Sequence, residues 1–104
     1  MQTTRIEQLK KLIVEEPNEV FYPYALALEL MKTDKKEALK IFENLIDKHP
    51  DYLPAYYQTG LLSIELSENE KARKYLETGI QLAFHQVDLK TRSELQSLLH
   101  QLDE

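Results

Sequence analysis

The sequence predicts an all-α protein, and three observations support this fold class. Apolar residues recur three and four positions apart along most of the 104 residues, which is the period of one helix face. Only two glycines and four prolines are present, so the chain has few residues suited to tight turns and bulges. The apolar pattern also repeats after 34 residues, as in proteins built from stacked helical pairs. We therefore expect about six helices.

Composition indicates one globular domain, residues 1–104. The chain contains 42% hydrophobic and 30% charged residues, values typical of soluble domains. A formal net charge of -5 argues against nucleic acid as a partner, because phosphate backbones attract basic surfaces. No cysteine occurs, which excludes disulfides and thiolate metal sites. The N-terminal residues lack the apolar core of a signal peptide, and no apolar run reaches the ~18 residues of a membrane span. We expect a cytoplasmic protein with no membrane partner.

The first helix is predicted to begin near Thr4 and to end before Pro17. Thr4 and Glu7 have the spacing of a capping box, in which each side chain accepts a hydrogen bond from the other residue's backbone amide. The apolar face of this helix consists of Ile6, Leu9, Leu12 and Ile13. We expect it to cap the N-terminal end of the domain.

The second and third helices are predicted at about Phe21 to Lys32 and at Lys36 to about Lys48. The second is apolar nearly all round, which is typical of a helix buried on several sides. Its Pro23 must lie in the first turn or so, where a missing amide hydrogen costs little. A short turn near 33–34 follows, and Pro50 ends the third helix. The apolar face of the third helix consists of Ala38, Leu39, Ile41, Phe42, Leu45 and Ile46.

Three more helices are predicted in the second half of the chain. The fourth spans about Leu53 to Leu66, and residues 67–70 form the turn after it. The sixth follows Asp88, spans roughly Leu89 to Leu102, and would cap the C-terminal end. The fifth helix is marked by Ala72, Tyr75, Leu76, Gly79, Ile80 and Ala83.

An internal repeat organises these helices. Ala38, Phe42 and Pro50 place a small residue, an aromatic one helical turn later, and a proline eight positions further on. Ala72 and Leu76 follow Ala38 and Phe42 after 34 residues, so the two copies are in register. Ala38 would let a neighbouring helix approach closely, and Phe42 would fill the space between helices.

This spacing resembles the tetratricopeptide repeat over roughly Pro17 to Ala83. Pro17 and Pro50 are 33 residues apart, which indicates one residue deleted from the turn near 33–34. The resemblance implies antiparallel helix pairs stacked as a short right-handed superhelix. It places repeats at 18–50 and 51–84, with capping helices at 3–16 and 88–103. Residues that depart from the family pattern are Pro23, Thr59, Ser63 and Phe84.

The resemblance implies a non-enzymatic protein–protein interaction module. In this family the first helix of each pair lines a concave groove, and alignment carries that role to one stripe on each of two helices. The stripes consist of Phe21, Tyr24, Leu28 and Met31, and of Pro54, Tyr57, Leu61 and Ile64. We expect this apolar surface to bind an apolar or amphipathic peptide or helix of a partner.

Two alternatives stay open for these stripes. They are core if the capping helices or a loop cover them. They are a self-association surface if two copies pair their grooves, which would make the chain a homodimeric scaffold. Family members that clamp acidic peptide tails carry basic residues and asparagine in the groove, so this ligand is not expected here. The corresponding places hold Tyr24, Leu28, Tyr57, Gln58 and Leu61.

No catalytic, metal or cofactor site is predicted. The histidines, His49, His85 and His100, lack a second ligand at helical spacing. No glycine-rich phosphate loop and no nucleophile elbow occur. The short basic runs at 10–11, 35–36 and 71–74 are interpreted as solvated helix faces, with partner contacts as the alternative.

Overall fold

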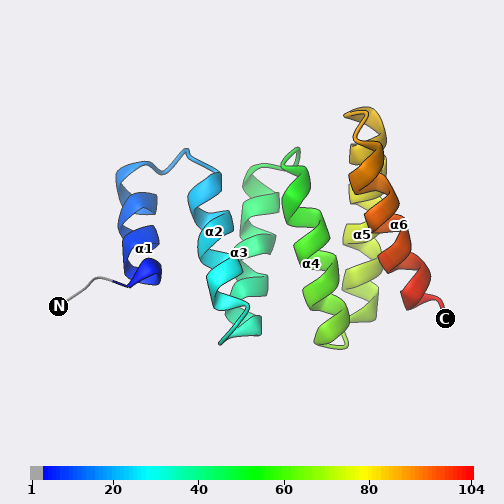
Figure 1. The fold of residues 1–104 in the computed structure, drawn as a ribbon, viewed down its shortest axis with the longest axis horizontal. Coiled ribbons are helices and arrows are strands. Elements are labelled where there is room, and N and C mark those ends of the chain that lie inside the picture. The colour runs from blue at the N-terminus through cyan, green and yellow to red at the C-terminus, as the bar shows by residue number, and fades with distance from the viewer. Residues whose placement is uncertain (1–3) are drawn as a thin grey trace.

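The computed structural model describes residues 4–104 and confirms the predicted all-α class. The chain runs from one end of an elongated row of helices to the other, and the molecule measures 48 × 28 × 20 Å along its principal axes (Figure 1). Each helix packs on the next one in sequence, and α4 also contacts α6. The helices are α1 (Arg5–Glu15), α2 (Phe21–Leu30), α3 (Lys35–Lys48), α4 (Leu53–Glu65), α5 (Asn69–His85) and α6 (Leu89–Leu102).

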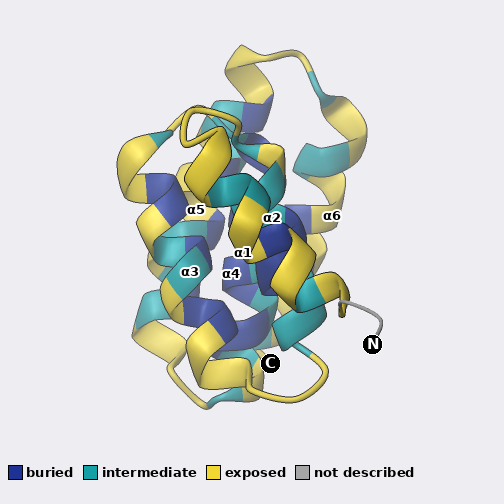
Figure 2. Cartoon of the chain, turned by 90° about the vertical axis from the view of Figure 1, so that its left-hand side faces the viewer, coloured by how far each residue is buried: buried dark blue, intermediate teal, exposed yellow. Residues whose placement is uncertain are grey.

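The helices after α1 form two layers. In the view of Figure 1, α3 and α5 lie behind α2, α4 and α6. Figure 2 looks along the row from the α1 end, with α3 and α5 on one side and α2 and α6 on the other. Antiparallel pairs α2–α3 and α4–α5 are thereby stacked side by side, with α1 before the first pair and α6 after the second.

The core of the described residues consists of three apolar clusters arranged along the row of helices. The cluster between α1 and α2 contains Leu9, Ala25 and Leu26. The central cluster of α2, α3 and α4 includes Phe42, Leu45 and Leu62, and the cluster of α4, α5 and α6 contains Leu53, Leu76, Ala83, Leu95 and Leu98. Each cluster draws on adjacent helices only, which is how stacked repeats bury surface that no repeat can bury alone.

Four of the residues that define the repeat are buried in the core. Ala38 and Phe42 are fully buried, as are their counterparts Ala72 and Leu76. The Phe42 ring meets the Tyr24 ring edge to face, with 5.7 Å between the ring centroids. The repeat places a small residue one helical turn before a large one, and this pair has the packing role that its spacing predicts.

Side-chain caps begin three of the helices. The Glu7 N–H donates to Thr4 Oγ1 (3.1 Å), which is the threonine half of the predicted capping box. Asp34 and Asp88 accept in the same way from the amides of residues 37 and 91, at 3.1 and 3.0 Å. The Asp34 cap begins α3, and α2 ends at Leu30, earlier than the predicted Lys32.

Left-handed residues end α4 and α5. Ser67 (φ 61°) and Val87 (φ 57°) stand just beyond the two helices. The amide of the following residue donates back to a carbonyl in the last turn, Glu68 to Ser63 (2.8 Å) and Asp88 to Ala83 (2.9 Å). This is the Schellman arrangement, whose left-handed position favours glycine.

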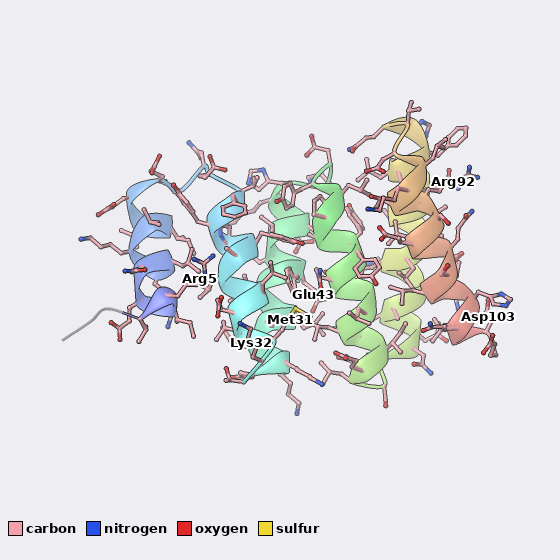
Figure 3. All side chains as sticks on the ribbon, in the orientation of Figure 1. Arg5, Met31, Lys32, Glu43, Arg92 and Asp103 are labelled. Carbon is pink, nitrogen blue, oxygen red and sulfur yellow. The ribbon has the colours of Figure 1, made fainter. Side chains whose placement is uncertain are left out.

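The end helices are attached by apolar contacts and ion pairs. Leu9 of α1 is buried against α2, and Arg5 extends from α1 to pair with Glu29 (3.0 Å; Figure 3). At the other end, Leu95 of α6 is buried and Asp103 pairs with Arg73 at 2.6 Å. Polar residues such as Lys10 and His100 are exposed on these end helices.

Candidate functional site

The eight predicted groove residues all retain solvent exposure. Phe21 and Pro54 are exposed, and the other six are half-buried. Seven of the eight lie on α2 and α4, and Met31 directly follows the last residue of α2. None of these side chains is enclosed in the core.

The inner sides of the half-buried residues take part in the core. Tyr24, Leu28 and Met31 pack against the cluster of α2, α3 and α4. On α4, the equivalent stripe packs against the cluster that includes α5 and α6; its members are Tyr57, Leu61 and Ile64. Each stripe thus has one side in the core and one side accessible to a partner.

A hollow of about 540 Å³ is lined by residues of α2, α4 and α6 and of the turns before α4 and α6. We call it the α2–α4–α6 hollow. It brings together three of the predicted residues, Tyr24, Pro54 and Tyr57, whereas the other five lie outside its lining. The remaining lining residues are Asp51, Tyr52, Leu53, Gln58, Gln86, Asp88, Thr91 and Glu94.

Aromatic contacts fix one wall of the hollow. The rings of Tyr24 and Tyr52 meet edge to face at a centroid distance of 5.5 Å, and Tyr24 is held from behind by buried Phe42. Burial and the neighbouring Tyr24 raise the pKa of the Tyr52 phenol, so it is neutral at ordinary pH. A neutral phenol can donate or accept a hydrogen bond at the rim.

A side-chain hydrogen bond closes the edge of the hollow. The Gln86 Nε2 amide donates to the Asp51 carbonyl oxygen at 2.9 Å, which joins the turn after α5 to the turn before α4. The two residues are far apart in sequence but adjacent in the fold. The hollow is therefore bounded by linked turns as well as by helices.

The charged groups of the lining are all acidic. They are Asp51, Asp88 and Glu94, and no lysine or arginine belongs to the lining within residues 4–104. Hydrogen bonds from the backbone and hydroxyl of Thr91 lower the pKa of Asp88, which keeps it ionised. In the described part of the chain, Asp51 and Glu94 form no salt bridge.

These acidic residues are not among the predicted site residues, because that prediction rests only on apolar stripes on the second and fourth helices. Asp51 and Asp88 stand in the turns just before α4 and α6, and Glu94 lies on α6. Their position before a helix does not distinguish them, because Asp34 and Glu68 also directly precede α3 and α5. The contribution of α6 follows from its packing on α4, which no local pattern reveals.

A second hollow, of about 450 Å³, lies between α1, α2 and α3. Apolar residues such as Ile13, Leu26 and Ile41 contribute to its lining. Its charged lining residues have both signs, including Glu37 and Lys40. It contains none of the eight predicted groove residues.

The basic runs are largely engaged in ion pairs. Lys71 lies 3.3 Å from Glu43 and 3.4 Å from Glu68, and Lys35 lies 3.8 Å from Glu65. The Lys71 pairs connect α5 to α3 and to the turn before α5. These pairs favour the interpretation of the runs as helix faces.

Neither metal-binding clusters nor spanning helices were found in residues 4–104. No group of three or more histidine, aspartate or glutamate side chains is placed to hold a metal ion there. None of the helices in this range combines the length and the apolar character needed to cross a membrane.

Comparison with known proteins identifies the family. Residues 19–52 match the family described as tetratricopeptide repeat. A tetratricopeptide repeat domain protein from Salinibacter ruber is 35% identical in its solution structure, with a TM-score of 0.78, and the match covers 84% of this chain and 89% of that one. Its crystal structure gives 34% identity and a TM-score of 0.78, over 82% of this chain and 97% of that one.

A protein from Bordetella parapertussis shares the fold, with a TM-score of 0.83 at 20% identity, over 98% of this chain and 90% of that one. No curated protein matches the sequence. The repeat spacing, the stacked helix pairs and the Salinibacter ruber match together show that this chain belongs to the tetratricopeptide-repeat family.

Proposed function

We propose that this chain binds an apolar or amphipathic segment of a partner protein along α2 and α4, without catalysing a reaction. Tetratricopeptide repeats generally serve as protein–protein interaction modules. The observation that carries the proposal is the accessibility of all eight apolar stripe residues. A cytoplasmic location remains a prediction from the sequence.

Tyrosines supply the strongest expected contacts. Tyr24 and Tyr57 are half-buried, so their rings are positioned by the core before a partner arrives. A preordered aromatic ring offers a large contact area with a polar tip and loses little conformational entropy on binding. Tyr57 lines the hollow from α4, the helix that lies between α2 and α6 of its layer (Figure 1).

Selection of peptides tests this proposal. The chain is immobilised and challenged with a displayed library of random peptides of fixed length, and enriched peptides are synthesised for titration. Tyr57→Ala should weaken their binding at least about tenfold, a value typical of a hot-spot truncation. Tyr22→Ala is the matched control, because Tyr22 is also half-buried but does not line the hollow.

Two results contradict the proposal. One is a library that yields no peptide whose binding depends on Tyr57. The other is a Tyr57→Ala variant that loses its helical circular dichroism signal, since this residue would then belong to the core. The thermal unfolding of both tyrosine variants is therefore recorded before any titration.

The second candidate function is a homodimeric scaffold that pairs the α2 and α4 stripes of two copies. The same accessible apolar residues favour it, since an isologous dimer joins identical patches. Light scattering over a wide concentration range distinguishes the two functions. A mass of 12.3 kDa at every concentration would rule out the dimer.

A further inference from the structure

The α2–α4–α6 hollow combines aromatic walls with a single sign of charge. Three tyrosines line it, Tyr24, Tyr52 and Tyr57, together with the carboxylates of Asp51, Asp88 and Glu94. Its volume of about 540 Å³ lies within the range of about 300–1,000 Å³ found for ligand clefts. A long side chain of a partner therefore fits inside.

The hollow remains negatively charged when the positive N-termini of the helices beside it are counted. The first turns of α4 and α6 border the hollow, and each N-terminus acts as about half a positive charge. Three carboxylates against two such dipoles leave a negative charge of about two. Asp88 already caps α6, whereas Asp51 and Glu94 form no salt bridge in residues 4–104.

Elsewhere on the described chain, several acidic groups between helices are paired with a cation. Arg5 pairs with Glu29, Lys71 with Glu43, and Arg73 with Asp103. The hollow is different because, among residues 4–104, no lysine or arginine lines it. The charge of Lys90 acts on Asp88 at its edge, whereas Asp51 and Glu94 form no salt bridge in the same residues. A positively charged side chain from another molecule would pair with these carboxylates.

We propose that this hollow receives an arginine or lysine side chain of the partner segment. The inference rests on the proposed function and adds the charge of the ligand to it. Asp51 and Glu94 supply charge-assisted hydrogen bonds, and the tyrosine faces attract a cation through their negative π surface. The apolar residues next to this basic side chain contact Pro54, Tyr57 and Leu61.

The same charge disfavours two other occupants. An acidic peptide would meet carboxylates with no basic residue to offset them. A second copy paired by a two-fold axis would bring one hollow against the other, so like charges would face each other. We therefore assign the hollow to a basic partner segment.

Synthetic peptides test the assignment directly. Peptides selected by display are remade with arginine, lysine, glutamine or glutamate at one position next to the apolar residues. We expect the arginine and lysine forms to bind about tenfold tighter than the glutamine form, and the glutamate form to bind weakest. This preference should shrink in salt, because the Debye length falls from about 10 Å at 0.1 M to about 3 Å at 1 M.

Matched variants locate the effect. The double substitution Asp51→Asn and Glu94→Gln should remove the preference for a basic residue while leaving the affinity of the glutamine peptide unchanged. The control is Asp47→Asn with Glu77→Gln, which makes the same change in net charge at exposed positions on α3 and α5. The control should keep the preference.

The outcomes separate this inference from the proposed function. If peptides bind through Tyr57 but the glutamine and arginine forms bind equally, or the Asp51/Glu94 variant behaves like the control, the basic-residue assignment is overturned and the binding function stands. If no peptide binding depends on Tyr57, both fail. A basic-residue preference abolished only by the Asp51/Glu94 variant supports both.

Discussion

Gly79 of α5 lies so close to Tyr56 of α4 that a Cβ atom added to the glycine would stand 2.8 Å from the tyrosine Cβ. On the same side it would approach Leu95 Cδ1 of α6 at 3.1 Å. The glycine thus lets α4, α5 and α6 approach one another closely. Gly60 of α4 has the same role toward Leu76.

Gly79→Ala should therefore destabilise the protein. Alanine gains about 1 kcal/mol of helix propensity over glycine, but overpacking typically costs about 1–3 kcal/mol. The tyrosine Cβ is tied to the backbone of α4, so it cannot rotate away. We expect a net loss of about 1 kcal/mol in the free energy of unfolding, measured by urea denaturation. Gln81→Ala, at an exposed site on α5, serves as the control. An increase in stability for Gly79→Ala would contradict the close approach of α5 to α4.

Val87→Gly should stabilise the protein by about 1 kcal/mol, because a β-branched residue is strained in the left-handed region. Val87 has φ 57° and is 76% exposed, so its side chain has little packing to lose. Val87→Ala keeps a Cβ atom and should gain less than the glycine variant. Thermal and urea unfolding compare them, and equal stability of wild type and Val87→Gly would mean that the turn relaxes without cost.

The sequence predicts more of the fold than of the candidate site. Periodic apolar residues and the residues that begin or end helices are local signals, so the sequence predicts the sixth helix at roughly Leu89 to Leu102, where α6 is observed. The hollow depends on packing instead: Tyr52 and Asp51 sit in a turn, and Glu94 reaches the site only because α6 contacts α4. Residue propensity also does not predict the left-handed conformation of Val87, because valine disfavours that conformation.

Thr59→Val should stabilise the protein. Thr59 is fully buried in α4, and its hydroxyl has no hydrogen-bond partner among residues 4–104. An unpaired buried hydroxyl costs about 1–3 kcal/mol, and valine has nearly the same shape. We expect a gain of about 1 kcal/mol or more in the free energy of unfolding.

Thr78→Val on α5 is the control for this change, because Thr78 is exposed and its hydroxyl donates to the Lys74 carbonyl at 2.9 Å. It should be neutral or slightly destabilising. A loss of stability in Thr59→Val would show that the hydroxyl has a partner in solution, such as a buried water.

Tyr75 should make the fold sensitive to alkaline pH. Burial and the adjacent Glu43 carboxylate, 3.3 Å from the phenol oxygen, raise the pKa of Tyr75 from 10.0 to about 12. The folded state then holds this proton more tightly than the unfolded state, so the contribution to stability is complete below pH 10 and is lost as the pH rises from 10 toward 12.

Tyr75→Phe should flatten this loss in urea unfolding measured across that range, because phenylalanine has no proton to release. Glu43→Gln should flatten it in part, since desolvation of Tyr75 remains when the carboxylate is gone. If Tyr75→Phe loses stability between pH 10 and 12 as steeply as the wild type, the alkaline sensitivity arises at other groups. Candidates are Tyr52 and Tyr56, whose pKa values burial also raises, and Lys71, whose pKa is raised against its burial by the hydrogen bond to Glu43.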